Sequence, residues 1–299
     1  MAYNEEADQG YLDLLIQGYT IIPNILSTDE VDRAKQLFYN WKDTIPDHDR
    51  LHRLIDPHGI YKFHEVGHQE HAWFIRTRPR LQNIYKYIYD TQELISSFDG
   101  CCYIDKDDNR IDKIWTHTDQ APKDKDFKCY QGFVSLTDNT KRTLVVYEET
   151  HDYHEQYFKD KGINHAKNWN LIDHDTLLKL KDKKRVLDVP AGALVMWDSR
   201  IFHQNQFGRE STKDKIPNEE RIVHYVCFFP KNHEQNTPAI QRKRRKYYEE
   251  RRTTSHWPCP IHVNGKQPQT YGNNDRFIDY TTLRTSNLSE LTINIQELL

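Results

Sequence analysis

A His-x-Asp motif, His117-Thr118-Asp119, ends the apolar, strand-like run that begins at Ile111. Side chains on a strand alternate between its two faces, so His117 and Asp119 are expected to point the same way. Two histidines and one carboxylate on one side of an iron(II) ion leave positions open for a bidentate cosubstrate and for dioxygen. With 16 histidines in 299 residues, an isolated His-x-Asp triplet arises easily by chance, so a third ligand is needed.

His203 is the best candidate for that third ligand. It ends the predicted strand 192–203, just before a long polar stretch, and the end of a sheet is where a jelly roll commonly opens its ligand site. A single histidine is more often hydrogen-bonded or solvated than metal-bound, so only the joint pattern carries weight. Two other groups have metal-like spacing, in polar or loop-like sequence, and we favour structural roles for them: His64, His68 and His71, and His151, His154 and Glu155.

Arg221 opens the run 221–229, in which both faces of a strand are largely apolar. A buried arginine keeps its charge and needs an anionic partner to offset desolvation. The distal carboxylate of 2-oxoglutarate would satisfy it in a bidentate manner. The alternatives are an internal ion pair, for instance with Asp198, or a solvated strand start. Arg200 and Arg209, which flank His203 in sequence, rank below Arg221 as anion ligands.

The composition is that of a globular protein. Hydrophobic residues make up 36% and charged residues 29%, and the net charge of -3 gives no general reason to expect nucleic acid or an anionic membrane as a partner. Five cysteines, two of them adjacent, fit free thiols in a reducing compartment better than a disulfide framework. No apolar run reaches the ~20 residues of a membrane span, and the acidic start is unlike a signal peptide. We therefore expect a cytoplasmic protein without membrane partners.

Sequence patterns predict where the elements lie. A capping box at Ser27, followed by apolar residues at helical spacing, predicts a helix over 28–41, and a second helix is expected over 79–89. Short strands separated by turn-rich segments are expected over 111–146 and again over 185–229. A basic helix over 238–252 and a short final helix follow.

This order predicts a mainly β protein with flanking helices, built on a double-stranded β-helix (jelly-roll, cupin-like) core. We expect a single oxygenase-sized domain, 1–299, with its parts as follows: N-terminal helical decoration 1–98, core about 99–230, helical insertion 151–185 within the core, and C-terminal extension 231–299.

Six stretches resemble the phytanoyl-CoA dioxygenase-like family of iron(II)- and 2-oxoglutarate-dependent oxygenases, in the same order and spanning about Gly18 to Pro258. They are GYTIIPNILS, ELISSFDG, IWTHTDQAPKDKDFKCYQGFVSLTD, PAGALVMWDSRIFHQN, RIVHYVCFFP and RTTSHWP.

The resemblance implies that three residues hold iron(II), namely His117, Asp119 and His203, that Arg221 binds 2-oxoglutarate, and that Asn205 assists it. It also implies hydroxylation of an unidentified substrate by dioxygen, with decarboxylation of 2-oxoglutarate to succinate. The 17 residues between His203 and Arg221 exceed the family's usual gap, so a longer hairpin is expected there.

The segment 241–252 leaves one alternative open. Seven of its twelve residues are basic, as in a nucleic-acid patch or targeting signal, although Glu249 and Glu250 partly neutralise it. The second hypothesis is therefore a non-catalytic jelly-roll binding module, tested by charge reversal at Arg244 and Arg245. A solvated helix face is the more common outcome for such a run, so we do not expect a nucleic-acid partner.

Overall fold

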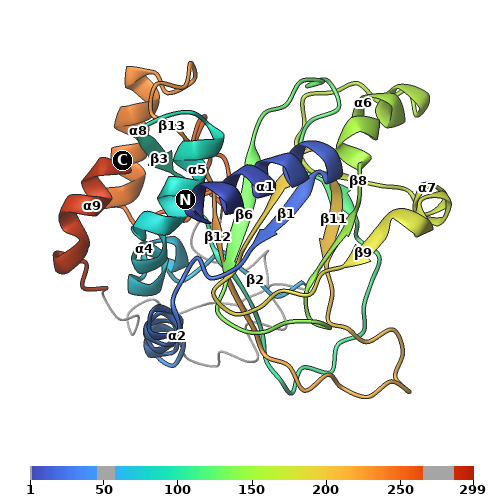
Figure 1. Cartoon of the computed structure of the whole chain (residues 1–299), viewed down its shortest axis with the longest axis horizontal. Coiled ribbons are helices and arrows are strands. Elements are labelled where there is room, and N and C mark those ends of the chain that lie inside the picture. Colours follow the sequence, from blue (N-terminus) through green and yellow to red (C-terminus); the bar gives the residue numbers. More distant parts are fainter. Residues whose placement is uncertain (1, 46–57, 265–285) are drawn as a thin grey trace, which may run out of the picture.

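Two antiparallel sheets form the centre of the protein, and helices flank them (Figure 1). The structure is a computed structural model that describes residues 2–45, 58–264 and 286–299. The six-stranded sheet has the order β1 (Tyr19–Ile22), β10 (Leu194–Asp198), β6 (Tyr130–Ser135), β12 (Arg221–Val226), β4 (Cys101–Ile104) and β2 (Ile60–Tyr61). The five-stranded sheet has the order β8 (Asn170–Leu171), β5 (His117–Thr118), β11 (Phe202–Asn205), β7 (Leu144–Tyr147) and β9 (Lys184–Val186). A small third sheet pairs β13 (Phe228–Pro230) with β3 (Leu94–Ser96).

The helices gather in two groups on opposite sides of the sheets (Figure 1). The first group comprises α1 (Ala2–Gln17), α2 (Thr28–Lys42), α4 (Glu70–Arg76), α5 (Pro79–Ile88), α8 (Pro238–Glu249) and α9 (Thr292–Glu297). The second comprises α6 (Thr150–Asp160) and α7 (His174–Lys179). Short 3-10 turns lie at η1 (Val66–His68), η2 (Lys181–Lys183) and η4 (Ser289–Leu291). None of the helices in the described ranges is long and apolar enough to cross a membrane.

Helix α2 forms where its capping box and its apolar spacing predict it. The Ser27 hydroxyl accepts a hydrogen bond from the Glu30 amide at 3.3 Å, and the Glu30 carboxylate accepts one from the Ser27 amide at 3.0 Å. The residues that α2 buries are Val31, Ala34, Leu37, Phe38 and Trp41. The predicted helix over 79–89 is also confirmed, and it starts with Pro79 in the first turn, where proline fits best.

The six-stranded sheet has a hydrophobic core on each face. Ile222 and Val226 of β12 pack with the helices of the first group, whereas Val223 packs in the cluster shared with the five-stranded sheet. Side chains alternate along a strand, so Arg221 and Tyr225 lie in phase with Val223 and face the space between the two sheets. Arg221, the one charged residue of β12, therefore points into the molecule.

The predicted continuous strand 192–203 is wrong. The chain leaves the six-stranded sheet at Asp198 and enters the five-stranded sheet at Phe202. The Asp198 carboxylate accepts a hydrogen bond from the Arg200 amide at 2.8 Å, and the Asp198 carbonyl accepts one from the Ile201 amide at 3.0 Å. These two hydrogen bonds close a turn that contains neither glycine nor proline. His203 therefore lies near the start of a strand and does not end one.

Two further differences concern the predicted helical parts. Helix α1 covers the acidic start, which lies in the predicted N-terminal helical decoration but for which no individual helix was predicted. The region predicted as a helical insertion also contains β8, which pairs with β5. The irregular region predicted after Arg252 lies partly outside the described residues.

Candidate metal and cosubstrate site

Three predicted ligands come together where β5 pairs with β11. His203 stands opposite His117 in the register of the two strands, and Asp119 follows β5 directly. Nε2 of His203 lies 3.3 Å from Oδ2 of Asp119, and Nε2 of His117 lies 3.7 Å from Oδ1. One ligand atom of each lies within 4.8 Å of the others, and in the described ranges no other three His, Cys, Asp or Glu residues meet this condition.

The protonation of the three side chains suits a divalent metal. Nδ1 of His117 lies 3.1 Å from the Trp115 carbonyl oxygen, and Nδ1 of His203 lies 3.0 Å from that of Ile201. Donation from Nδ1–H to a backbone carbonyl leaves Nε2 of each ring, the nitrogen nearer Asp119, available to bind a metal. Burial, with His203 nearby, lowers the pKa of His117 to about 3. Burial acts to raise the pKa of Asp119, but His117 and the hydrogen bond to His203 outweigh it and the pKa is lowered.

The turn between β10 and β11 holds the His-x-Asp segment in place. The Ser199 carbonyl oxygen accepts three hydrogen bonds, from the Asp119 amide at 3.2 Å, the Gln120 amide at 3.1 Å and the Thr118 hydroxyl at 3.0 Å. The same turn begins the strand that carries His203. Because the predicted strand is divided by this turn, the turn itself lies next to all three candidate ligands.

Gln204, beside His203, joins β11 to the residues before His117. Its Oε1 accepts from the Trp115 amide at 3.1 Å and the Thr116 hydroxyl at 2.7 Å, and its Nε2 donates to the Lys113 carbonyl at 3.2 Å. The Trp115 indole donates to the Asn205 carbonyl at 2.9 Å. The distance between the two histidines is thus fixed by side chains as well as by backbone pairing.

Arg221 is buried and has no anionic partner among the described residues. It is 1% exposed, its Nη1 lies 3.8 Å from the Cys102 sulfur, and its Cζ lies 5.4 Å from the Phe133 ring centroid. Its Nη2 has no hydrogen-bond partner in the part of the chain that the structure describes. Asp198, the alternative partner, instead forms an ion pair with Arg200 at 2.7 Å.

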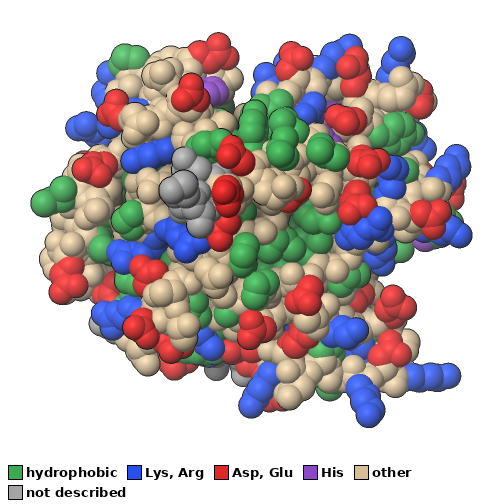
Figure 2. Space-filling view, in the orientation of Figure 1, with side chains coloured by type: hydrophobic (Ala, Val, Ile, Leu, Met, Phe, Trp, Pro, Cys, Tyr) green, Lys and Arg blue, Asp and Glu red, His purple; other side chains and the backbone are tan. Residues whose placement is uncertain are grey.

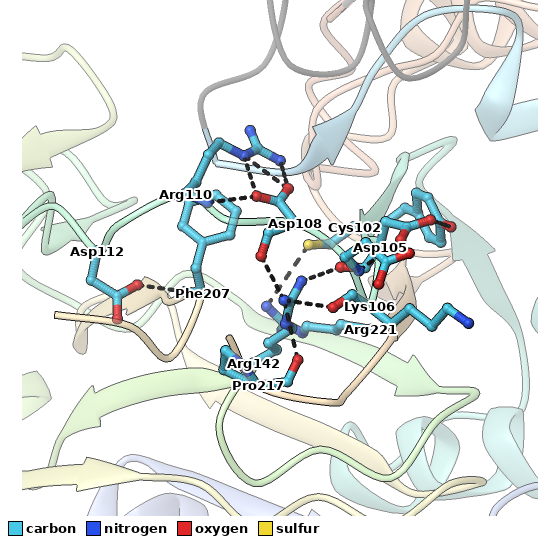
Figure 3. Close-up of polar contacts among 12 residues, drawn as sticks. Cys102, Asp105, Lys106, Asp108, Arg110, Asp112, Arg142, Phe207, Pro217 and Arg221 are labelled. Carbon is cyan, nitrogen blue, oxygen red and sulfur yellow. Dashed lines mark hydrogen bonds and ion pairs between the residues drawn. The ribbon is translucent and has the colours of Figure 1, made fainter. Parts of the chain in front are cut away.

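A second buried arginine nearby uses both of its terminal nitrogens within the fold (Figure 3). Arg142 is 0% exposed and donates hydrogen bonds to carbonyl oxygens of four loop residues, namely Asp105, Lys106, Asp108 and Pro217. In Figure 3 Arg221 reaches only the Cys102 sulfur among the residues drawn. Arg142 is therefore occupied by the fold, whereas Arg221 retains donors for a ligand. The Arg209 side chain lies on an exposed loop and donates hydrogen bonds to three backbone carbonyls there.

Asn205 connects Arg221 to the metal side of the site. Its Nδ2 lies 3.1 Å from the Tyr225 hydroxyl and 3.8 Å from the Cys102 sulfur, which Arg221 also contacts. Neither Tyr225 nor Cys102 was singled out from the sequence. The alternation along 221–229 placed Tyr225 on the same face as Arg221, and that was the available signal.

A pocket with a volume of about 160 Å³ adjoins the three predicted ligands. Residues of β6, β7, β10, β11 and β12 line the part that we call the inner end, among them Gln131, Leu144, Trp197, Asn205 and Tyr225. Half-buried or exposed residues of other segments line the part that we call the outer end, among them Ile60, Lys62, Asp99, Trp115, Trp169 and His256. The inner end thus combines polar groups with apolar walls, as is typical of a small-molecule site.

The competing histidine groups serve the packing of the protein. The stretch with His64, His68 and His71 was predicted as a polar loop, but all three side chains are buried. Nε2 of His68 lies 3.0 Å from the Arg252 carbonyl oxygen, and the His71 ring packs edge-on to Phe38. In the other group, both histidines contact backbone carbonyls and the glutamate forms a surface ion pair: His151 with Leu15, His154 with Gln120, and Glu155 with Lys125.

The basic helix α8 is not a uniformly exposed charged face, which corrects one part of the nucleic-acid hypothesis. Arg244 is 0% exposed and donates to the carbonyl oxygens of Ser96, Pro258, Leu298 and Leu299. Reversing its charge would disrupt the fold and would not test binding. On the face shown in Figure 2, Lys and Arg side chains alternate with Asp and Glu and form no continuous basic patch.

Sequence comparison gives a distant relative and no family assignment. No protein-family model matches the chain. A curated protein of Aspergillus versicolor, Ava biosynthesis cluster protein O, is 26% identical over 240 residues, which are 72% of this chain and 75% of that protein.

Three solved structures share the fold at low sequence identity. GlcNAc Inducible Gene 2 (DUF1479) from Candida albicans has a TM-score of 0.53 and 13% identity, covering 76% of this chain and 69% of that one. EctD from S. alaskensis, with 2-oxoglutarate and 5-hydroxyectoine, has a TM-score of 0.51 and 14% identity, covering 74% and 75%. HygX from Streptomyces hygroscopicus, with nickel and 2-oxoglutarate bound, has a TM-score of 0.51 and 10% identity, covering 75% and 87%. The chain therefore has a fold also found in proteins whose structures contain 2-oxoglutarate.

Proposed function

We propose that the protein is an iron(II)- and 2-oxoglutarate-dependent oxygenase with a jelly-roll core, similar to the phytanoyl-CoA dioxygenase-like family, that hydroxylates an unidentified substrate. The observation that carries the proposal is the convergence of His117, Asp119 and His203. It is supported by Arg221, a buried guanidinium with no anionic partner among the described residues, which contacts the same Cys102 sulfur as Asn205 of the pocket. The fold shared with structures containing 2-oxoglutarate supports the same reading.

The residues present fit the iron. Two neutral imidazoles and one carboxylate supply three ligands on one side, and their Nδ1–H donors to backbone carbonyls orient the rings. Iron(II) together with 2-oxoglutarate and dioxygen supplies the oxidising power for hydroxylation, with succinate and carbon dioxide as coproducts. The protein's own task is to hold Asp119 ionised and to orient Nε2 of both rings toward the same position.

The residues present also fit 2-oxoglutarate. Arg221 would pair with its distal carboxylate through the Nη2 donors that find no partner in the described residues. Asn205 and Tyr225 would hydrogen-bond the cosubstrate along its length, since both line the pocket. Trp197 and Leu144 would exclude water from the inner end.

Anaerobic titration of the metal-free protein with iron(II) and 2-oxoglutarate tests the proposal through the visible charge-transfer band of the chelate. We expect a band in the native protein and none in His117→Ala or His203→Ala. His174→Ala, on the exposed start of α7, is the matched control and should retain the band. Absence of the band in the native protein, or its survival in both ligand variants, contradicts the assignment.

Arg221→Ala separates the two binding steps. Loss of a charge-assisted pair should weaken 2-oxoglutarate binding by about 10- to 100-fold, with little change in iron affinity. Arg209→Ala provides the control, because Arg209 lies on an exposed loop. Unchanged 2-oxoglutarate affinity in Arg221→Ala would assign the anchor to another residue.

A further inference from the structure

The outer end of the pocket contains a carboxylate, Asp99, that the proposed metal and cosubstrate site does not use. Asp99 lies between β3 and β4, is half-buried, and lines the same pocket as His117 and Asp119. Its Oδ1 accepts a hydrogen bond from the Gly100 amide at 2.7 Å, and no ion pair joins it to any residue that the structure describes. Asp99 was not among the residues singled out from the sequence.

The backbone on both sides of Asp99 is fixed. The Phe98 amide donates to the Thr254 hydroxyl at 3.0 Å, and the Thr254 amide donates to the Phe98 carbonyl at 2.8 Å. The Asp99 carbonyl accepts from Nη2 of Arg76 at 2.8 Å. A short side chain on this backbone stays in the pocket, whereas Lys62 across the outer end has a long, flexible stem that can reach solvent.

Neighbouring groups offset the desolvation of the Asp99 carboxylate only in part. Burial raises the pKa of Asp99, although His256, the Gly100 amide and Arg76 all act to lower it. His256 also lines the pocket, and its Nε2 is buried without a hydrogen-bond partner in the described ranges. A carboxylate desolvated to this degree is stabilised by a cation that enters the pocket.

The inner end has no excess positive charge once iron(II) and 2-oxoglutarate are bound there. If the proposed function holds, the charges of iron(II), the Asp119 carboxylate, the 2-oxoglutarate dianion and the Arg221 guanidinium sum to zero. The inner end then contributes no net positive charge, and neither Lys62 nor His256 of the lining forms an ion pair with Asp99 in the described ranges, so a cationic substrate can supply the counter-ion. Aromatic side chains at the outer end favour the same chemistry, because a cation is attracted to the face of an indole ring. Trp169 is 44% exposed, and its ring centroid lies 5.4 Å from that of His117.

We propose that the outer end of this pocket binds a substrate bearing a cationic amine nitrogen, which pairs with the Asp99 carboxylate and lies beside the Trp169 ring. The inference rests on the proposed function for the charge balance and for the position of the reacting carbon. It adds a substrate class, a basic amine, and a specificity-determining residue, Asp99.

Three small isosteres of different charge test the proposal: 2-phenylethylamine, 2-phenylethanol and 3-phenylpropionate. Binding is followed by quenching of tryptophan fluorescence, both in the metal-free protein and in protein loaded with nickel(II) and 2-oxoglutarate, so no turnover is needed. We expect the amine to bind about tenfold or more tightly than the alcohol, as for a charge-assisted hydrogen bond, and the carboxylate to bind weakest.

Asp99→Asn should abolish the preference for the amine, since the amide keeps the shape and the acceptor for Gly100 but loses the charge. Asp107→Asn, on the exposed loop after β4, is the matched control and should keep the preference for the amine. No binding of the amine, equal binding of amine and alcohol, tighter binding of the carboxylate, or a preference that survives Asp99→Asn would overturn the proposal.

The chelate titration separates this inference from the proposed function. A normal charge-transfer band without amine preference overturns the substrate class alone. An amine preference in protein that forms no chelate with iron(II) and 2-oxoglutarate overturns the proposed oxygenase function and keeps Asp99 as an amine site.

Discussion

His203 lies directly opposite His117 across the antiparallel pair of β5 and β11, and the centroids of their rings are 4.4 Å apart. The distance between these two side chains is set by strand register, because a slip of one residue would turn one ring to the other face of the sheet. Gln204 reinforces that register through hydrogen bonds to three residues before His117, namely Lys113, Trp115 and Thr116.

Gln204→Ala should weaken iron binding without removing any ligand. The variant leaves the Trp115 amide and the Thr116 hydroxyl without their acceptor, and we expect metal affinity to fall about 10- to 100-fold, as for other residues that orient ligands. Calorimetric titration with iron(II) under anaerobic conditions measures the change. Gln206→Ala is the control, since Gln206 donates to the Lys141 carbonyl on the exposed side of the same strand end. Equal losses in both variants would contradict a positioning role.

Cys102→Asp should block 2-oxoglutarate binding by giving Arg221 an internal partner. The Cys102 sulfur lies 3.8 Å from Nη1 of Arg221, so a carboxylate at this position can pair with the guanidinium. We expect a loss of 2-oxoglutarate affinity of about 10-fold or more with iron affinity retained, measured by the same chelate titration. Cys102→Ser, similar in size and uncharged, should bind 2-oxoglutarate nearly as the native protein does. Normal binding in Cys102→Asp would argue that Arg221 is not the anchor.

His71 should contribute to acid unfolding. Burial, with Arg76 nearby, lowers its pKa to about 3, and neither ring nitrogen has a hydrogen-bond partner in the described ranges. Below the unfolded-state pKa of about 6.5 the unfolded chain binds a proton that the folded protein excludes. The free energy of unfolding should therefore fall as the pH drops from about 6.5 towards 3, by about 1.4 kcal/mol per pH unit from this residue.

Denaturant unfolding of His71→Leu between these pH values tests the contribution. The variant should lose stability less steeply than the native protein, whereas His174→Gln, at an exposed position, should follow the native curve. Parallel curves for His71→Leu and the native protein would show that His71 accepts its proton while folded.

Arg244→Met and Arg245→Met should differ sharply in stability. Arg244 satisfies four carbonyl oxygens from three separate segments, and its removal should cost on the order of 3 kcal/mol or more, as for other buried polar networks. Arg245 is exposed on the same helix and should change stability by less than about 0.5 kcal/mol. Thermal unfolding of both variants makes the comparison, and a stable Arg244→Met would remove the structural role assigned to this residue.

Local patterns were sufficient to predict the elements that carry them. The capping box at Ser27 and the apolar runs around Val134 and Val145 predicted α2, β6 and β7 in the right places. The break between β10 and β11 was missed because its polar stretch, Asp198 to Arg200, is short and lies between two apolar runs, and the turn is made by the Asp198 carboxylate instead of glycine or proline. Helix α1 was missed because its sequence is polar and lacks a marked apolar stripe.

The candidate ligands were predictable because two of them lie on one short motif and the third follows an apolar run. Arg221 was predictable from its position at the start of a buried strand. Asp99 and His256 were not, because they approach the pocket only after Phe98 and Thr254 are joined by long-range hydrogen bonds. Contacts between segments more than 150 residues apart leave no local trace in composition or periodicity.

The division of the pocket between strands and connecting segments affects how the protein can diverge. Gln131, Asn205 and Tyr225 belong to paired strands, where a substitution or deletion shifts the neighbouring register. Lys62, Trp169 and His256 belong to connections whose length can change at little energetic cost. Related proteins can therefore come to accept different molecules while the strands that carry the candidate metal ligands stay the same.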